Sequence, residues 1–161
     1  MREGRRGLPV IGSALVTAVL ALFPAMSGRN RECIEARRDA IARQIEETAR
    51  AFPSVRPEVM VAVAFSETHL GCDRGEGGGW GAPVDRHHRH TAGTHLHAAA
   101  VLARSMVICR GDELSAVRRF RTGLCHPLRQ SSSALVGRVG ERYGRRVLAL
   151  AERLSSAAGG R

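Results

Sequence analysis

The sequence predicts a mainly α domain held together by two disulfides, with a long Gly/His-rich loop between two of its helices. Three observations predict this fold class. Apolar residues recur at helical spacing along most of the 161 residues, and no run alternates between polar and apolar residues as a half-buried strand does. Four Cys in a chain with an export-like beginning indicate disulfides. The length suits one domain with a single core.

The N-terminus has the pattern of a signal peptide. Three Arg stand within the first six residues, and residues 8–25 are almost wholly apolar. Ala25 and Ser27 are the small residues that a signal-peptide cleavage site needs at positions −3 and −1, counted back from the cleaved bond. We therefore expect residues 1–27 to be removed near Ser27 and Gly28, and the mature protein to be exported to the periplasm or the extracellular space. An uncleaved N-terminal anchor is the alternative.

The composition is strongly basic. The formal net charge is +10, and the chain contains no Lys, so every cationic side chain other than His is Arg. This charge attracts polyanions, which for an exported protein are cell-wall polymers, lipid headgroups or nucleic acid. Nucleic acid is not the expected partner, because aromatic residues do not interleave with the basic ones. We expect a monomer that contacts the cell envelope only peripherally.

The four Cys all follow the apolar segment, which is typical of two disulfides in a small exported domain. Three pairings are possible. We favour Cys109–Cys125, which would close a loop around one short helix, and this leaves Cys33–Cys72. A zinc site is the alternative, but the close spacing of two Cys that such sites use is missing.

Residues with clear end preferences divide the chain into helices. Pro57 suits a first helical position, and Thr94 and Asp112 suit N-caps. Gly71 and Gly123 suit left-handed stops. The expected helices cover residues 31–52, Pro57 to the stop at Gly71, Thr94 to Gly111, Asp112 to Gly123, and 133–154. We expect the domain to span residues 28–154 and residues 155–161 to form a disordered tail.

The helix that begins at Pro57 is apolar on nearly every side, which indicates a buried helix. Glu67 lies near its end and shares a face with Met60, Val63 and Ala64. A carboxyl that points toward a core must be neutralised, paired or placed at the edge of a cleft. Burial raises a carboxyl pKa above the ordinary value of about 4.3, and a general acid needs a raised pKa. The alternative is a helix-end residue with a solvated tip.

Residues 71–93 form an irregular Gly-rich segment, and loops of this length are usually functional or disordered. Trp80 is the only Trp, and it could either fold back over the core or stack on a sugar ring. Residues 85–97 hold five of the seven His, but their spacing matches no standard metal site, so we expect no metal. Asp85 is the only acid of this stretch.

Three short motifs resemble the soluble lytic transglycosylases and goose-type lysozymes. The first is the helix with Pro57, Ala62 and the pair Glu67-Thr68, followed by the glycine-rich residues 78–83 in place of the family's Gly-Ala-x-Gly-Leu-Met-Gln loop. The second is residues 117–123, where the family has Ala-x-x-Tyr-Asn-x-Gly and this chain has Phe120, Arg121 and Gly123. The third is the closing segment that begins at Tyr143.

The resemblance implies a lysozyme-like domain that cleaves peptidoglycan glycan strands without a cofactor. Glu67 would be the catalytic acid, and Asp85 could position water. The resemblance also implies a set of residues that bind substrate: Thr68, Trp80, Gly81, Phe120, Gly123 and Tyr143. The alternative is a lysozyme-like module that binds glycan without cleaving it, which Phe120, Arg121 and the missing Met-Gln favour. A basic protein that binds nucleic acid or anionic surfaces is a second alternative.

Overall fold

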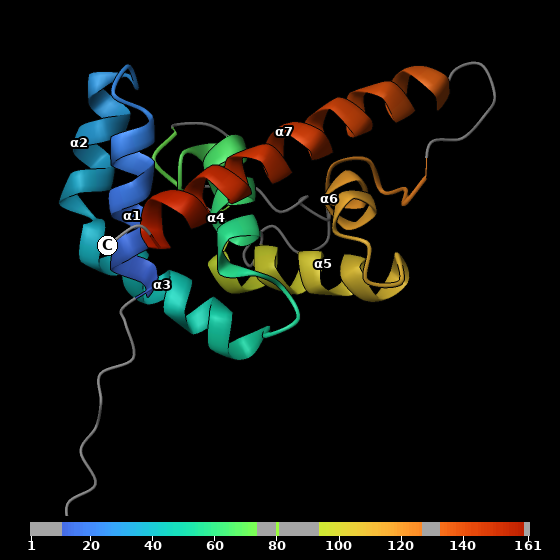
Figure 1. Ribbon diagram of the computed structural model, residues 1–161, viewed down its shortest axis with the longest axis horizontal. Coiled ribbons are helices and arrows are strands. Elements are labelled where there is room, and N and C mark those ends of the chain that lie inside the picture. The colour runs from blue at the N-terminus through green and yellow to red at the C-terminus, as the bar shows by residue number, and fades with distance from the viewer. Residues whose placement is uncertain (1–10, 74–79, 81–93, 127–132, 160–161) are drawn as a thin grey trace, which may run out of the picture.

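The structure is a computed structural model that describes residues 11–73, 80, 94–126 and 133–159 (Figure 1). In these ranges the chain forms helices and no strand, so the prediction of a mainly α fold is confirmed. The helices are α1 (Ile11–Leu22), α2 (Gly28–Ala36), α3 (Arg38–Ala51), α4 (Pro57–Thr68), α5 (His95–Ile108), α6 (Glu113–Thr122) and α7 (Ser133–Gly159).

Helix α4 is the central element, and α3, α5 and α7 pack against it (Figure 1). The seven residues 59–65 are all buried, with exposed fractions between 0% and 6%. Pro57 begins this helix as expected. The end differs from the prediction, because the left-handed cap is His69 and Gly71 lies two residues further on.

The expected starts of α5 and α6 are confirmed, but α5 ends at Ile108, before the stop expected at Gly111. The Thr94 hydroxyl accepts a hydrogen bond from the backbone N–H of His97, at 3.0 Å, and the Asp112 carboxylate accepts one from the backbone N–H of Ser115, at 2.9 Å. The side chain and the backbone N–H of Ser115 lower the pKa of Asp112 below its ordinary value. Gly123 ends α6 in the left-handed region, with φ of 80°. Both disulfides form as predicted, Cys33–Cys72 and Cys109–Cys125.

Two further predicted boundaries are wrong. The single helix expected over residues 31–52 is divided at Arg37, whose backbone leaves helical geometry between α2 and α3. The disordered tail expected from residue 155 is also wrong in part, since α7 continues to Gly159. The reason is tertiary packing, because Leu154 is fully buried and Ala157 and Ala158 pack against the core.

Helix α1 packs on α3 and α7, and it covers the core at this end of the molecule (Figure 1). Leu15, Val16 and Val19 have no exposed surface. Just beyond α1, the Phe23 ring lies 4.4 Å from the ring of Phe65 in α4, measured between centroids. The structure therefore places residues 11–27 of the predicted signal segment within the fold of the unprocessed chain. No described helix is both long and apolar enough to cross a membrane.

The crossing of α1 over α3 depends on Gly12. A Cβ built at Gly12 would lie 2.2 Å from the backbone oxygen of Ala42, so a side chain at this position would push the two helices apart. Gly12→Ala should lower the free energy of unfolding of the full chain by about 1–3 kcal/mol, which is typical of overpacking. Chemical denaturation of the purified chain measures the change.

Gly28→Ala is the matched control, because a Cβ at Gly28 meets nothing within 4 Å. It should leave stability unchanged or raise it slightly, since Ala favours the helix over Gly. Equal stability of the wild type and the Gly12→Ala variant would show that α1 does not pack on α3.

Candidate active site

Glu67 lies in the last turn of α4, where the cover provided by the surrounding helices ends. Its side chain is 11% exposed, so the carboxylate is largely removed from water. One oxygen, Oε2, lies 3.1 Å from a guanidinium nitrogen of Arg121 in α6. The structure thus places Glu67 between the core and the surface, in an ion pair with an Arg side chain.

Tyr143 of α7 is the second polar group next to Glu67. Its side chain is buried, with 6% exposed, and its hydroxyl lies beside the Glu67 carboxylate without the geometry of a regular hydrogen bond. Burial raises the pKa of Tyr143, and the neighbouring Glu67 carboxylate raises this pKa further. The phenol therefore keeps its proton near neutral pH and can donate it in a hydrogen bond beside the Glu67 carboxylate.

Glycines allow α6 and α7 to approach closely enough to bring Arg121 and Tyr143 together. A Cβ at Gly140 would lie 2.8 Å from side-chain carbons of Arg118 and Thr122. A Cβ at Gly144 would lie 2.8 Å from a methyl carbon of Leu114. The guanidinium of Arg121 accordingly lies 5.8 Å from the centroid of the Tyr143 ring, within the range of a cation–π contact.

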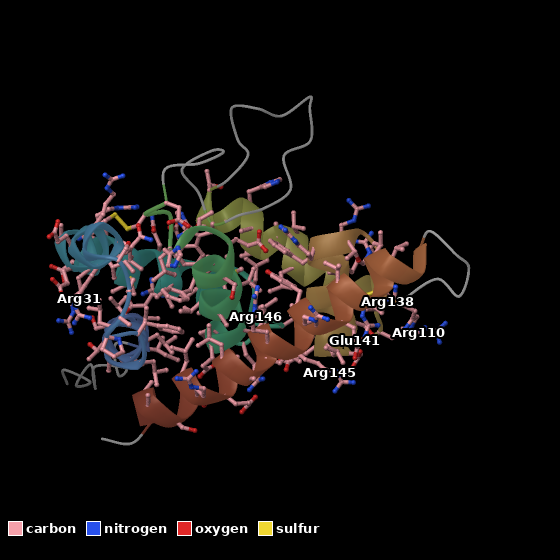
Figure 2. All side chains as sticks on the ribbon, turned by 90° about the horizontal axis from the view of Figure 1, so that it is seen from above. Arg31, Arg110, Arg138, Glu141, Arg145 and Arg146 are labelled. Atoms are coloured by element: carbon pink, nitrogen blue, oxygen red, sulfur yellow. A yellow bond between two sulfur atoms is a disulfide. The ribbon has the colours of Figure 1, made fainter. Side chains whose placement is uncertain are left out.

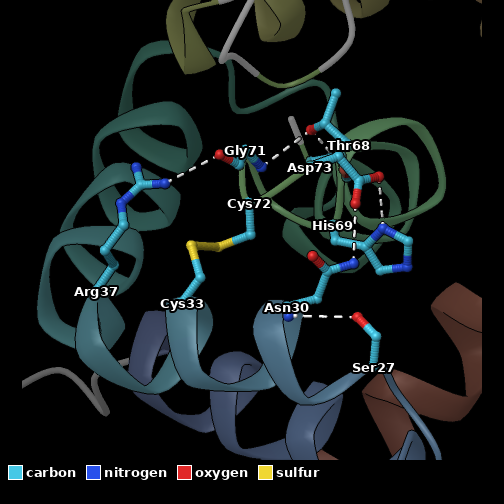
Figure 3. Close-up of a disulfide and its surroundings, with 10 residues drawn as sticks. Ser27, Asn30, Cys33, Arg37, Thr68, His69, Gly71, Cys72 and Asp73 are labelled. Atoms are coloured by element: carbon cyan, nitrogen blue, oxygen red, sulfur yellow. Dashed lines mark hydrogen bonds and ion pairs between the residues drawn. A yellow bond between two sulfur atoms is a disulfide. The ribbon is translucent and has the colours of Figure 1, made fainter. Parts of the chain in front are cut away.

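The turn after Glu67 has an unusual backbone that the first disulfide holds in place (Figure 3). His69 and Leu70 are not glycines, yet their φ angles are 47° and 60°. The left-handed conformation costs such residues about 1–2 kcal/mol each. The Cys33–Cys72 disulfide ties the turn to α2, with Cα atoms 5.8 Å apart.

Hydrogen bonds support the same turn (Figure 3). Arg37 donates to the backbone oxygen of Gly71 at 3.2 Å. The Asp73 carboxylate accepts from the Asn30 side chain at 2.9 Å and lies 2.7 Å from Nδ1 of His69. Together with the disulfide they fix the end of α4, and therefore the position of Glu67.

Two of the residues expected to bind substrate have structural roles instead. The Thr68 side chain is buried, and its hydroxyl donates to the backbone oxygen of Ala64 and accepts from the N–H of Gly71. Phe120 is 3% exposed and belongs to the core. Gly123 is the left-handed cap of α6 and is exposed, so its contact with substrate stays a prediction.

Trp80 is also buried, with 2% exposed, so neither face of its ring is free for a sugar. It folds back over the core, as the alternative interpretation held, and its ring centroid lies 5.9 Å from that of His95. The expected sugar stacking is therefore wrong. Gly81 and Asp85 lie outside the described residues. In the described part no group of three His, Cys, Asp or Glu side chains could hold a metal ion.

The sequence analysis did not identify the arginines beside Glu67 as functional residues. Arg121 lines a cavity of about 280 Å³ together with residues of α7. The complete lining is Arg121, Arg138, Val139, Arg142, Tyr143 and Arg146. The signal that could have found them is the spacing of Arg138, Arg142 and Arg146, four residues apart on one helix.

Comparisons of this chain with protein-family models, with curated proteins and with solved structures find no match.

Tyr143 is the only tyrosine, so the absorbance of its phenolate reports on this site alone. In the folded protein it should titrate well above its ordinary pKa of 10.0. Glu67→Gln removes one of the two causes and should lower this pKa, which burial still keeps above the ordinary value. An ultraviolet pH titration, with circular dichroism to confirm folding, measures both values.

Glu58→Gln is the matched control for this titration, because Glu58 lies in the first turn of the same helix. It should leave the pKa of Tyr143 unchanged. A phenol that titrates at its ordinary value in the folded wild type, or that responds equally to both substitutions, would contradict the placement of Tyr143 beside Glu67.

Proposed function

We propose that this protein is an exported glycosidase of the lysozyme-like or lytic transglycosylase kind, which cleaves the glycan strands of peptidoglycan. The observation that carries the proposal is the environment of Glu67. A single carboxyl emerges from the end of a buried helix, is 11% exposed, and lies beside a cavity with a buried phenol at its edge. Glycosidases use carboxyl groups in such environments as general acids.

The chemistry uses one carboxyl twice. In the first step the oxygen of the substrate's N-acetyl group attacks the anomeric carbon, while Glu67 gives its proton to the departing glycosidic oxygen. In the second step Glu67 accepts a proton from the group that opens the resulting ring. Water in that role gives a hydrolysis product, and the 6-hydroxyl of the muramyl sugar gives an anhydro sugar. These steps need no cofactor and no second carboxylate.

Glu67 acts first as an acid, in its protonated form, and then as a base, in its ionised form. Arg121 and Tyr143 are the two neighbours that can interact with these forms. The guanidinium of Arg121 lies within ion-pair distance of the carboxylate, which is the form that acts as the base. The phenol of Tyr143 is a neutral donor that can bind whichever carboxylate oxygen carries no proton. We propose Tyr143 as the residue that orients the Glu67 carboxyl, because Phe120 has no hydroxyl for this task.

A second candidate function is glycan binding without cleavage. The observation that favours it is the ion pair between Glu67 and Arg121, because a carboxylate held by a guanidinium is not a ready proton donor. Both candidates predict a monomer that binds glycan strands, and they differ only in whether the strands are cut.

Loss of turbidity in a suspension of purified peptidoglycan tests the proposal. Wild type should clear the suspension, and Glu67→Gln should reduce the rate by about 100-fold or more, as expected for loss of a general acid. Glu67→Gln should still bind the sedimented polymer, since the shape of the side chain is kept. Glu58→Gln, at the other end of the same helix, should clear it at the wild-type rate.

Cleavage by the wild type and by Glu67→Gln at equal rates would contradict the role of Glu67. Binding without any cleavage by the wild type would instead support the second candidate. If the wild type neither binds nor cleaves the polymer, both candidate functions are contradicted.

The two disulfides indicate a non-reducing compartment, in agreement with export. We propose that residues 1–27 act as the export signal and are removed near Ser27 and Gly28. Removal would uncover the faces of α3 and α7 that α1 covers in the unprocessed chain.

N-terminal sequencing of protein from its native host should return a start at or near Gly28. The chain 28–161, expressed alone in an oxidising compartment, should then fold with both disulfides. A native protein that begins within the first ten residues would contradict processing and would make α1 a permanent part of the core.

A further inference from the structure

The cavity beside Glu67 has a cationic lining. Among the described residues, four Arg side chains border it, one from α6 and three from α7, and no acidic side chain does. Its volume of about 280 Å³ is at the lower end of the range that holds a whole small molecule. The cavity therefore suits one charged substituent of a larger ligand.

The three arginines of α7 are not compensated by acids. Arg138, Arg142 and Arg146 follow one another at intervals of four residues, so they share a helix face and repel each other. In the described part of the chain none of them forms an ion pair, whereas Arg145 on the same helix pairs with Glu141 at 2.7 Å (Figure 2). Like charges grouped in this way are stabilised by an anion between them.

Two further features show what kind of anion fits. Tyr143 contributes a buried ring to the lining, and the guanidinium groups of Arg121 and Arg146 each lie 5.8 Å from the centroid of that ring. Val139 is 50% exposed and adds an apolar wall to the same cavity. The lining thus combines cations and a phenol with an apolar contact.

We propose that this cavity binds the free lactyl carboxylate of a muramyl sugar whose stem peptide has been removed, and that the bound carboxylate pairs with Arg121 in place of Glu67. The inference rests on the proposed function and names the group that the site recognises. A carboxylate pairs with guanidinium groups through parallel hydrogen bonds. The lactyl methyl group stands next to that carboxylate and would contact Val139, whereas a phosphate has no apolar part.

Arg121 is the link between the cavity and the acid. It lines the cavity and also lies 3.1 Å from Glu67. Without substrate its guanidinium is the partner of the Glu67 carboxylate, whereas the first step of cleavage needs Glu67 to carry a proton. A carboxylate in the cavity competes for the same guanidinium, so the substrate itself releases the acid for protonation.

Binding of two sugars that differ only in the lactyl group tests the recognition. N-acetylmuramic acid should bind the full chain about tenfold more tightly than N-acetylglucosamine, and this advantage should shrink at high salt. Nuclear magnetic resonance signals of Tyr143, the only tyrosine, locate the binding. Arg142→Gln should remove the advantage. Arg145→Gln should keep it, because Arg145 pairs with Glu141 outside the cavity.

Equal binding of the two sugars would overturn the proposal, and so would an equal loss in both variants. Inorganic phosphate is the third probe. If it binds as tightly as N-acetylmuramic acid, the cavity is a general anion site and the assignment to the lactyl group is wrong.

Cleavage of glycan strands freed of their peptides tests whether the substrate carboxylate replaces Glu67 as the partner of Arg121. Wild type should cleave strands with free lactyl carboxylates about tenfold faster than the same strands with amidated carboxylates. Arg121→Gln should cleave the two at similar rates, because no guanidinium remains to be drawn away. If the Arg121→Gln variant still prefers strands with free carboxylates, the proposed exchange of partners at Arg121 is wrong. If the wild type cleaves neither, the proposed function fails, while the sugar-binding result still decides whether the cavity recognises the lactyl group.

Discussion

The burial of α4 on every side is the constraint on which the rest of the structure depends. A helix whose residues 59–65 are all buried needs other helices around it, and α3, α5 and α7 supply that cover. Such a helix can carry charge only at its ends, which is where Glu58 and Glu67 stand. Glu67 therefore reaches the surface where the cover ends. The Cys33–Cys72 disulfide then fixes the turn that follows.

The parts of the fold that the sequence predicts correctly are those with local causes. Pro57, Thr94 and Asp112 act through their own backbone or their nearest neighbours, and the structure uses each of them to begin a helix. The break at Arg37 and the helical turn beyond residue 154 have causes elsewhere in the chain. Arg37 donates to Gly71 beside the Cys33–Cys72 disulfide, and the turn beyond residue 154 packs on the core. Periodicity within one segment reveals neither contact.

The same distinction explains what could be predicted of the candidate site. The apolar surroundings of Glu67 are visible in its own helix, but its partners Arg121 and Tyr143 come from α6 and α7. The resemblance placed a hydroxyl at the position of Phe120, whereas the structure brings one to Glu67 from Tyr143. Trp80 stands among glycines in the sequence, so only the structure shows that its ring is covered.

Arginine has two different uses in this chain, and only the partners of each side chain distinguish them. Arg56 binds Glu113 with two bonds of 2.8 Å and also Glu152, so it joins the start of α4 to α6 and α7. These contacts raise the pKa of Arg56 and show a cation committed to the fold. Arg138, Arg142 and Arg146 on α7 have no such acid among the described residues. Because a fold gains nothing from grouping unpaired cations beside a cavity, their arrangement is better explained by a ligand that supplies the missing negative charge.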